Sequence, residues 1–488
     1  MLFNSFEFLV FLPVVFLLYW FAFRERRWQN MLVVVASYVF YGWWDWRFLL
    51  LIVLTSLCSY GSGLLLEHYE GRRSRQKAVS ATNIVLNLGI LGVFKYYNFF
   101  VGNLDALLGM MGWRLDWVTM NVILPVGISF YTFQALSYTI DVYQKKLPAT
   151  HDIVEFFAYI SFFPQLVAGP IERATNLLPQ FQRRRTFDYA KAVDGCRQML
   201  WGFFKKMVIA DNCAIAVNQI WAGYQGETGF VLLIGAVLFT FQIYCDFSGY
   251  SDIAIGCARL FGFDLMRNFN FPYFSRSIPE FWRRWHISLT TWFRDYIYFP
   301  LGGSRCDKKT IIRNVYIVWA VSGLWHGANW TFVCWGLYHG TLLAAYNLFG
   351  ISTKYKNVVA YGRWLPSIRE LLQILLTFFL AVIGWVIFRA ETMTDAVGYL
   401  STLFSRSLFD IGGSLALLKG LDLRQTLPAL AVLVLSEWIQ RDRQHAMQIS
   451  GTNFLMRKAW FRYVLYFAIA MATICLAGTQ SEFIYFQF

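Results

Sequence analysis

The sequence predicts an all-α protein that crosses a membrane several times. Of its 488 residues, 57% are hydrophobic and only 15% are charged, and its mean hydropathy is +0.44. A soluble domain carries about 25% charged residues because its surface must be solvated, so much of this surface is expected to face lipid. Apolar stretches recur along the chain with short basic clusters between them, which is the pattern of a polytopic integral membrane protein.

The first apolar stretch covers residues 6–23. It has no basic segment before it and no small-residue cleavage site after it, so we expect it to be retained as a span rather than removed as a signal peptide. Further stretches long enough, or nearly long enough, to cross about 30 Å of hydrocarbon begin at Met31, Phe48, Val79, Val118, Phe156, Leu200, Phe230, Ile311, Thr331, Leu371, Leu427 and Tyr463. Some of these are expected to be half-helices or re-entrant segments.

Basic residues account for a net charge of +14 and predict the orientation. They cluster in loops at residues 24–27, 72–77 and 183–185, as cytoplasmic loops do, and not along the continuous face that binds nucleic acid. Two spans between the first two clusters place both clusters in the cytoplasm and the amino terminus outside. The loop at 102–117 has Arg114 as its only base and is expected outside.

The chain is expected to form one membrane domain over residues 1–488, because it shows no fixed repeat and no separate soluble segment. Its most polar interior region, residues 265–314, carries nine Lys or Arg against three acids. Eight cysteines are scattered without a C-x-x-C pair, so we expect neither a disulfide framework nor a zinc site.

Histidines are the first candidates for chemistry. Three of the six lie in polar loops or charged runs, namely His68, His151 and His445. His326 instead ends an apolar run in Gly-Leu-Trp-His-Gly-Ala-Asn, and an ionisable group at membrane depth is a candidate functional residue. A neutral imidazole can take a proton from an attacking hydroxyl and pass it to a leaving group, as acyl transfer from a thioester requires. The alternative is a histidine that only hydrogen-bonds between helices.

The second candidate, His286, lies in the basic region within Phe-Trp-Arg-Arg-Trp-His. Arg283 and Arg284 beside it have guanidinium groups that match the phosphates of a nucleotide-like thioester donor. The alternative for both arginines is an ordinary cytoplasmic charge cluster.

Acids and hydroxyls interrupt the apolar segment at residues 244–252, and they include Asp246, Ser248, Tyr250 and Asp252. Carboxylates at membrane depth are expected to point inward. There they could orient an imidazole, line an aqueous path or join helices by hydrogen bonds.

Two small-x-x-x-small pairs lie in the region of the third interior histidine, His339. Gly323 with Gly327 and Gly336 with Gly340 are expected to let two helices approach closely. His339 lies within the second pair, so its expected role is structural. No G-x-S-x-G, H-E-x-x-H or Walker-type motif is present, which excludes serine hydrolase, zincin and P-loop chemistry.

Six motifs carry a family resemblance: Leu-Pro-Val-Gly-Ile-Ser-Phe-Tyr-Thr-Phe at 124–133, Phe-Phe-Pro-Gln-Leu-Val-Ala-Gly-Pro at 162–170, Tyr-Cys-Asp-Phe-Ser-Gly-Tyr-Ser-Asp at 244–252, Glu-Phe-Trp-Arg-Arg-Trp-His-Ile-Ser-Leu at 280–289, Gly-Leu-Trp-His-Gly-Ala-Asn at 323–329 and Phe-Ile-Tyr-Phe-Gln-Phe at 483–488. Together they resemble the membrane-bound O-acyltransferase family, and within it the bacterial alginate O-acetyltransferase branch.

The resemblance implies about 11 transmembrane helices, with re-entrant and peripheral helices, around a central tunnel in the bacterial inner membrane. It places the family's essential histidine at His326, next to Trp325 and Asn329, and its second, loop-borne histidine at His286. It implies no permanent cofactor or metal. The donor would be a cytoplasmic acetyl thioester, on coenzyme A or an acyl carrier protein. The acetyl group would emerge for an esterase-like partner protein outside and an acceptor polysaccharide such as alginate, cellulose, peptidoglycan or teichoic acid.

Two other functions remain open at this stage. A transporter or flippase also needs many spans and a polar midplane, but it typically shows inverted repeats with broken helices, and the sequence has no paired broken segments. A non-catalytic scaffold of a polysaccharide-acetylation complex would tolerate replacement of both histidines.

Overall fold

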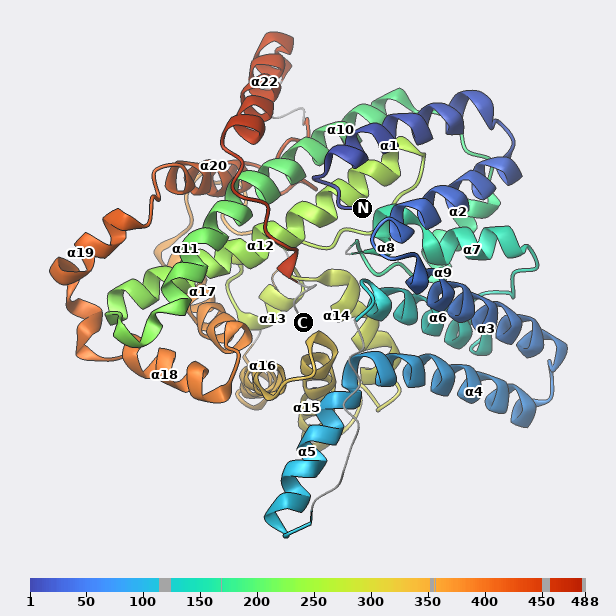
Figure 1. Ribbon diagram of the computed structural model, residues 1–488, viewed down its shortest axis with the longest axis horizontal. Coiled ribbons are helices and arrows are strands. Elements are labelled where there is room, and N and C mark those ends of the chain that lie inside the picture. The colour runs from blue at the N-terminus through green and yellow to red at the C-terminus, as the bar shows by residue number, and fades with distance from the viewer. Residues whose placement is uncertain (114–123, 168, 352–354, 356, 450–456, 485–488) are drawn as a thin grey trace. The chain divides into compact units, whose positions relative to one another are not determined.

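The computed structural model describes residues 1–113, 124–167, 169–351, 355, 357–449 and 457–484, and these residues form helices and no strand (Figure 1). The predicted all-α class is therefore confirmed for the described part of the chain. The helices group into two compact units, one of residues 1–192 with 257–266 and the other of residues 193–256 with 267–488. That the whole chain is one domain stays a prediction.

The first unit contains α1 (Phe6–Leu17), α2 (Arg26–Gly42), α3 (Leu49–His68), α4 (Arg73–Leu91), α5 (Tyr97–Met110), α6 (Ile128–Tyr143), α7 (Ile153–Ser161), α8 (Phe163–Leu166) and α9 (Ala174–Gln182). Buried polar side chains join three of these helices: Asn83 of α4 donates to Thr139 of α6 at 2.7 Å, and Ser62 of α3 lies 3.1 Å from the same hydroxyl. Such hydrogen bonds hold helices together where lipid removes the hydrophobic driving force.

The second unit contains most of α10 (Tyr189–Phe203) and α12 (Gly229–Leu260), then α11 (Asp211–Ala222), α13 (Ile278–Trp282), α14 (Ile287–Phe293), α15 (Lys308–His326), α16 (Trp330–Leu348), α17 (Ile368–Arg389), α18 (Met393–Leu403), α19 (Ile411–Gly420), α20 (Thr426–Ile439) and α22 (Ala459–Cys475). A π-helical segment, Phe204–Ala210, joins α10 to α11. Most of the basic region 265–314 forms short helices and turns rather than a long span.

Glycines let α15 and α16 pack with their backbones in contact, as the small-x-x-x-small pairs predict. A Cβ on Gly323 would collide with the carbonyl oxygen of Phe332, and a Cβ on Gly336 with that of Trp319. Only glycine permits so close an approach at these positions. The pair of helices places His326, at the end of α15, in a fixed position against α16.

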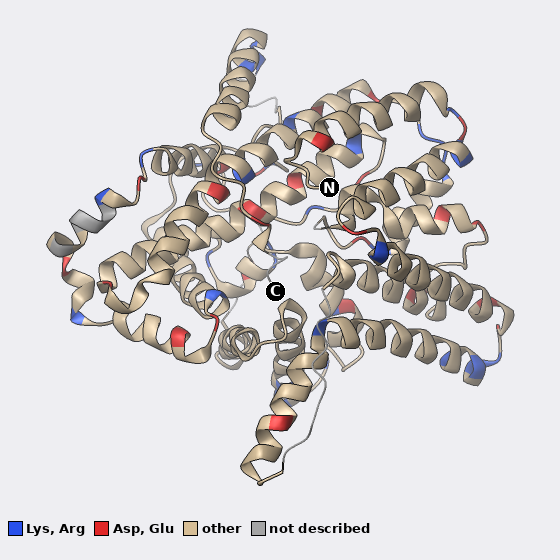
Figure 2. Cartoon of the chain, viewed as in Figure 1, with Lys and Arg blue, Asp and Glu red and all other residues tan. Residues whose placement is uncertain are grey.

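Within the described part of the chain, four helical segments are long and apolar enough to cross a membrane: Trp46–His68, Arg73–Met110, Gly229–Leu260 and Ile368–Arg389. They coincide with the stretches predicted from Phe48, Val79, Phe230 and Leu371. Shorter apolar helices at Phe6–Ala22, Thr426–Ile439 and Ala459–Cys475 coincide with three more predicted stretches. Charged residues are few along most helices (Figure 2). The chain is therefore a membrane protein, while the count of about 11 spans stays a prediction.

Two stretches differ from the predicted spans. The stretch from Phe156 is broken after Ser161, because Pro164 begins the next short helix, α8, and proline cannot continue a preceding helix. The helix of α5 extends through residues 102–110, so the predicted outer loop at 102–117 is mostly helical. Residues 114–123, where the stretch from Val118 begins, lie outside the described part.

Candidate active site

His286 and His326 line one cavity of about 350 Å³ in the second unit. The cavity is lined mainly by apolar and aromatic side chains, including Trp282, Phe293 and Trp319. Both histidine side chains are almost completely buried from solvent, with 1% and 5% of their surface exposed. A largely apolar cavity with a few convergent polar groups is the usual form of a small-molecule site.

The position of His326 follows from the end of α15. Gly327 has an extended backbone, with φ of −168°, and so ends the helix directly after the histidine. Aromatic rings surround the imidazole at centroid distances of 5.0 Å for Trp325, 4.9 Å for Trp335 and 5.2 Å for Phe388. The helix end and the rings together fix the imidazole at the cavity wall.

His286 stands at the start of α14 in a left-handed backbone conformation, with φ of +42°. Its Nδ1 lies 3.1 Å from Oδ1 of Asn268, and the ring of Phe247 packs edge-on against it at 4.6 Å. Burial lowers the pKa of His286 to about 3, so this imidazole, which lies outside the four candidate spans, is neutral at physiological pH.

Trp325 lies between the two histidines, with ring centroids 5.9 Å from His286 and 5.0 Å from His326. It is 4% exposed and packs edge-on against both imidazoles. Asn329, the other residue of the same motif, caps α16: its Oδ1 accepts from Thr331 N and its Nδ2 donates to the carbonyl of Glu391 at 2.8 Å. Both residues therefore support the site structurally.

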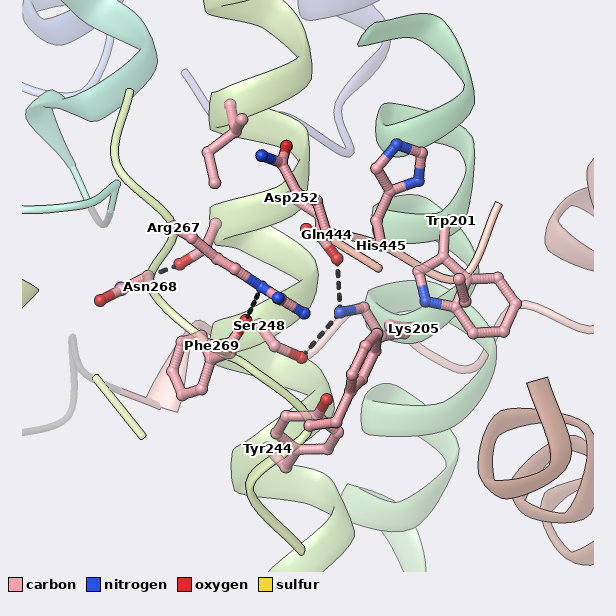
Figure 3. Close-up of a pocket in the computed structure, with 14 residues that line it drawn as sticks. Trp201, Lys205, Tyr244, Ser248, Asp252, Arg267, Asn268, Phe269, Gln444 and His445 are labelled. Atoms are coloured by element: carbon pink, nitrogen blue, oxygen red, sulfur yellow. Dashed lines mark hydrogen bonds and ion pairs between the residues drawn. The ribbon is translucent and has the colours of Figure 1, made fainter. Parts of the chain in front are cut away.

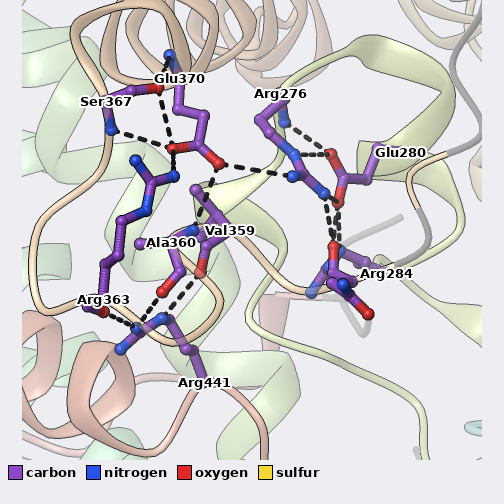
Figure 4. Close-up of polar contacts among 10 residues, drawn as sticks. Arg276, Glu280, Arg284, Val359, Ala360, Arg363, Ser367, Glu370 and Arg441 are labelled. Carbon is purple, nitrogen blue, oxygen red and sulfur yellow. Dashed lines mark hydrogen bonds and ion pairs between the residues drawn. The ribbon is translucent and has the colours of Figure 1, made fainter.

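Arg283 and Arg284 have different surroundings. Arg283 is exposed and lines the cavity. Arg284 instead donates to Oε1 of Glu280 through Nε at 3.2 Å and Nη2 at 2.9 Å (Figure 4). Arg276 donates to the same carboxylate. Arg283 lines the cavity, whereas Arg284 is paired with Glu280 and is not among its lining residues.

Asp252 and Ser248 of α12 hold a buried lysine (Figure 3). Lys205 Nζ lies 2.6 Å from Oδ2 of Asp252 and donates to Oγ of Ser248 at 2.9 Å. Gln198 also donates to Asp252, at 2.7 Å. Lys205, Ser248 and Asp252 line a second, smaller pocket together with Asn268, and they are not among the residues that line the larger cavity.

Asp246 anchors the C-terminal segment. Its carboxylate lies 2.7 Å from Nζ of Lys206 and accepts from Ile484 N at 2.7 Å. Lys206 Nζ also donates to Ser481 O at 3.1 Å. Tyr250 packs against the ring of Phe483 in the same segment, at 5.0 Å. The last four residues of the 483–488 motif lie outside the described part of the chain.

His339 is held within aromatic packing, as expected. Its Nδ1 accepts from Trp282 Nε1 at 3.3 Å, and the rings of Trp319 and Trp335 lie within 5.6 Å of it. Within the described residues no group of three or more His, Cys, Asp or Glu side chains could hold a metal ion.

The sequence analysis missed Lys205, Lys206 and Asn268. The two lysines interrupt an apolar stretch, and ionisable residues in such a stretch are themselves a signal for buried, paired groups. Asn268 gave no such signal, because its importance depends on contacts with residues 17 to 20 positions along the chain.

The known proteins to which this chain is similar have names that describe transfer of an acyl group. The model of the membrane-bound O-acyltransferase family matches residues 38–355. The probable alginate O-acetylase AlgI of Pseudomonas aeruginosa is 42% identical over 406 residues, covering 83% of this chain and 75% of that protein. The peptidoglycan O-acetyltransferase of Helicobacter pylori is 32% identical over 82% of this chain and 79% of its own length. The teichoic acid D-alanyltransferase of Bacillus subtilis is 30% identical over 56% of this chain and 70% of its own length.

Proposed function

The chain belongs to the membrane-bound O-acyltransferase family and is an acyltransferase. We propose that it moves an acetyl group from a cytoplasmic thioester donor to hydroxyls of an extracytoplasmic polysaccharide such as alginate. The observation that carries this proposal is the single cavity lined by both His286 and His326. The names of the alginate O-acetylase relatives, at 42% identity over most of the chain, favour acetyl as the group and alginate as the acceptor.

His326 is the general base of the proposed reaction. Its imidazole takes the proton as an acceptor hydroxyl attacks the thioester carbonyl. The carbon–sulfur bond then breaks, and the imidazolium returns the proton to the departing thiolate, which leaves an ester and a free thiol. An apolar cavity suits this step because exclusion of water strengthens local electrostatics and suppresses hydrolysis of the thioester.

His286 and Arg283 bind and orient substrates in this proposal. His286 shares the cavity with His326, and Arg283 is an exposed residue that lines it. A guanidinium group is suited to a phosphate of coenzyme A or of a carrier protein's prosthetic group. The ester formed at the acceptor hydroxyl carries the acetyl group toward the outer side of the bacterial inner membrane, where an esterase-like partner protein completes its transfer to the polysaccharide.

Replacement of the histidines tests the proposal. General acid or base catalysis contributes about 10²- to 10⁴-fold to rate, so His326→Ala should lower acetyl transfer by at least that range. His286→Ala should lower it too, and an effect confined to donor KM would mean a binding role. The measurement is transfer from labelled acetyl thioester by purified protein in detergent, with His68→Ala, in an exposed position, as the control.

Near-normal transfer by His326→Ala at normal abundance would remove the catalytic assignment. Movement of substrate across the membrane without cleavage of the thioester would favour a transporter. Full polysaccharide acetylation in cells after replacement of both histidines would favour a scaffold.

A further inference from the structure

Asn268 is a buried residue that hydrogen-bonds both Ser251 of α12 and the ring of His286. It is 0% exposed and lies in the segment between α12 and α13. Its backbone carbonyl accepts from Ile287 N at 2.9 Å, and its side-chain Nδ2 donates to Oγ of Ser251 on α12 at 3.1 Å. The same side chain presents Oδ1 to Nδ1 of His286 at 3.1 Å. One residue therefore contacts both the ring of His286 and the backbone N–H of the next residue, Ile287.

The orientation of the Asn268 amide follows from its neighbours. The backbone N–H of Ser288 points at the amide atom that faces His286, at 3.4 Å, and Ser288 Oγ lies 2.9 Å from the same atom. A backbone N–H can only donate, so this atom must be the oxygen. The nitrogen of the amide then faces Ser251, whose hydroxyl can accept. Both ends of the amide are satisfied in this orientation and in no other.

That orientation selects one histidine tautomer, because Ser288 Oγ, which also lies 3.4 Å from Nδ1 of His286, makes its shorter contact by donating to Asn268 Oδ1 at 2.9 Å. Oδ1 of Asn268 can only accept, so a hydrogen bond at 3.1 Å requires the proton on Nδ1 of His286. A neutral imidazole carries one ring proton, so Nε2 holds a lone pair. A histidine oriented in this way by a buried partner is a common feature of functional sites.

We propose that Asn268 is a positioning residue that holds His286 as its Nδ1-protonated tautomer, so that Nε2 serves the cavity as a hydrogen-bond acceptor. This inference rests on the proposed function, and it specifies how His286 contributes to substrate binding in that function. With a lone pair on Nε2, His286 binds a substrate O–H or N–H group. It does not donate to the thioester carbonyl, so it does not act as the electrophilic group that stabilises the oxyanion.

The direct test is nitrogen NMR of histidine-labelled protein in detergent, with the His286 signals identified by their loss in His286→Gln. We expect a protonated Nδ1 and an unprotonated Nε2 in the native protein. Asn268→Asp keeps an acceptor oxygen and should keep Nδ1 protonated, whereas Asn268→Leu removes the acceptor and should lose this signature. A protonated Nε2 and bare Nδ1 in the native protein, or an unchanged signature in Asn268→Leu, would overturn the proposal.

Activity provides the second readout. Asn268→Leu should lower acetyl transfer by about 10- to 100-fold, the range known for loss of a partner that orients a metal-binding imidazole. Ser251→Ala is the matched control: it removes the other hydrogen bond of the Asn268 side chain but leaves the acceptor at His286, and should stay within about threefold of native activity. Equal losses in Asn268→Leu and Ser251→Ala would mean a merely structural role and would overturn the proposal. Because the NMR signature does not require catalysis, failure of the proposed function would be recognised separately.

Discussion

Single residues in the basic region differ in role according to what their side chains touch. Arg283 and Arg284 are adjacent and chemically identical, and the sequence left both open as phosphate-binding residues or as an ordinary cytoplasmic charge cluster. In the structure Arg283 reaches the cavity, while Arg284 belongs to a buried cluster with Glu280 and Arg276. The difference arises because Arg284 lies four residues after Glu280, at the spacing that brings two side chains to one side of a helical turn. Adjacent residues such as Arg283 and Arg284 point in different directions.

The two arginines therefore give a matched pair of variants. Arg283→Ala should raise the KM for the thioester donor several-fold and lower the thermal midpoint less than Arg284→Ala does, because Arg283 is the more exposed residue of the two. Arg284→Ala should lower the free energy of unfolding by about 1 to 3 kcal/mol, because Glu280 keeps its buried carboxylate but loses one of two charged partners. Donor kinetics and thermal unfolding in detergent measure both effects. An unchanged donor KM in Arg283→Ala would contradict the phosphate-binding role.

The residues that carry chemistry were more predictable than those that support them. His326 and His286 could be found because few polar groups occur in so apolar a chain and because their motifs resemble a known family. The partners of Asp246 and Asp252 could not be found. Lys206 lies 40 residues before Asp246 and Lys205 lies 47 residues before Asp252. Only the packing of α12 against Phe204–Ala210 brings these partners together. The catalytic and binding roles of the histidines themselves stay predictions until they are tested.

At the scale of elements, the length of each apolar stretch in the sequence predicted where helices form better than it predicted where they end. Stretches from Phe48, Val79, Phe230 and Leu371 became long helices. The stretch from Phe156 did not, because Pro164 lies within it, and average hydropathy is insensitive to a single helix-breaking residue. The close pairing of α15 and α16 was predictable from glycine spacing alone, since the absence of side chains at these positions is visible in the sequence.

Gly323 gives the prediction for this pair of helices. Gly323→Ala places a Cβ against the carbonyl of Phe332, so the helices must separate, at about 1 to 3 kcal/mol of unfolding free energy. His326 follows three residues later and should move with the helix, which lowers acetyl transfer as well. Thermal unfolding and transfer assays measure the two effects.

The control for this prediction is Gly61→Ala in α3, where the added Cβ would meet nothing within 4 Å. Alanine is favoured over glycine within a helix by up to about 1 kcal/mol, so this variant should be as stable as the native protein or more so. Equal behaviour of the two variants would show that the contact between α15 and α16 is looser than the structure has it.

At the scale of the whole molecule, the orientation in the membrane depends on α2. Basic residues at 24–27 and 72–77 should both be cytoplasmic, which requires both α2 and α3 to cross. Trp46–His68 is long and apolar enough to do so. Helix α2 has 17 residues and buries Gln29, Asn30 and Ser37, so it spans about 25 Å at 1.5 Å per residue. It is slightly short for a 30 Å core and its polar side chains face protein rather than lipid.

Cysteine labelling in intact cells tests this orientation. In a variant without native cysteines, Arg24→Cys and Ser74→Cys should react with a membrane-impermeant maleimide only after the inner membrane is opened. Met111→Cys should react in intact cells, because the helical segment Arg73–Met110 crosses once and Met111 is 64% exposed. If Ser74→Cys reacts from outside while Arg24→Cys does not, α2 does not cross. Arg72–Lys77 would then lie on the opposite side from Arg24–Arg27, and the basic clusters would have predicted the wrong topology.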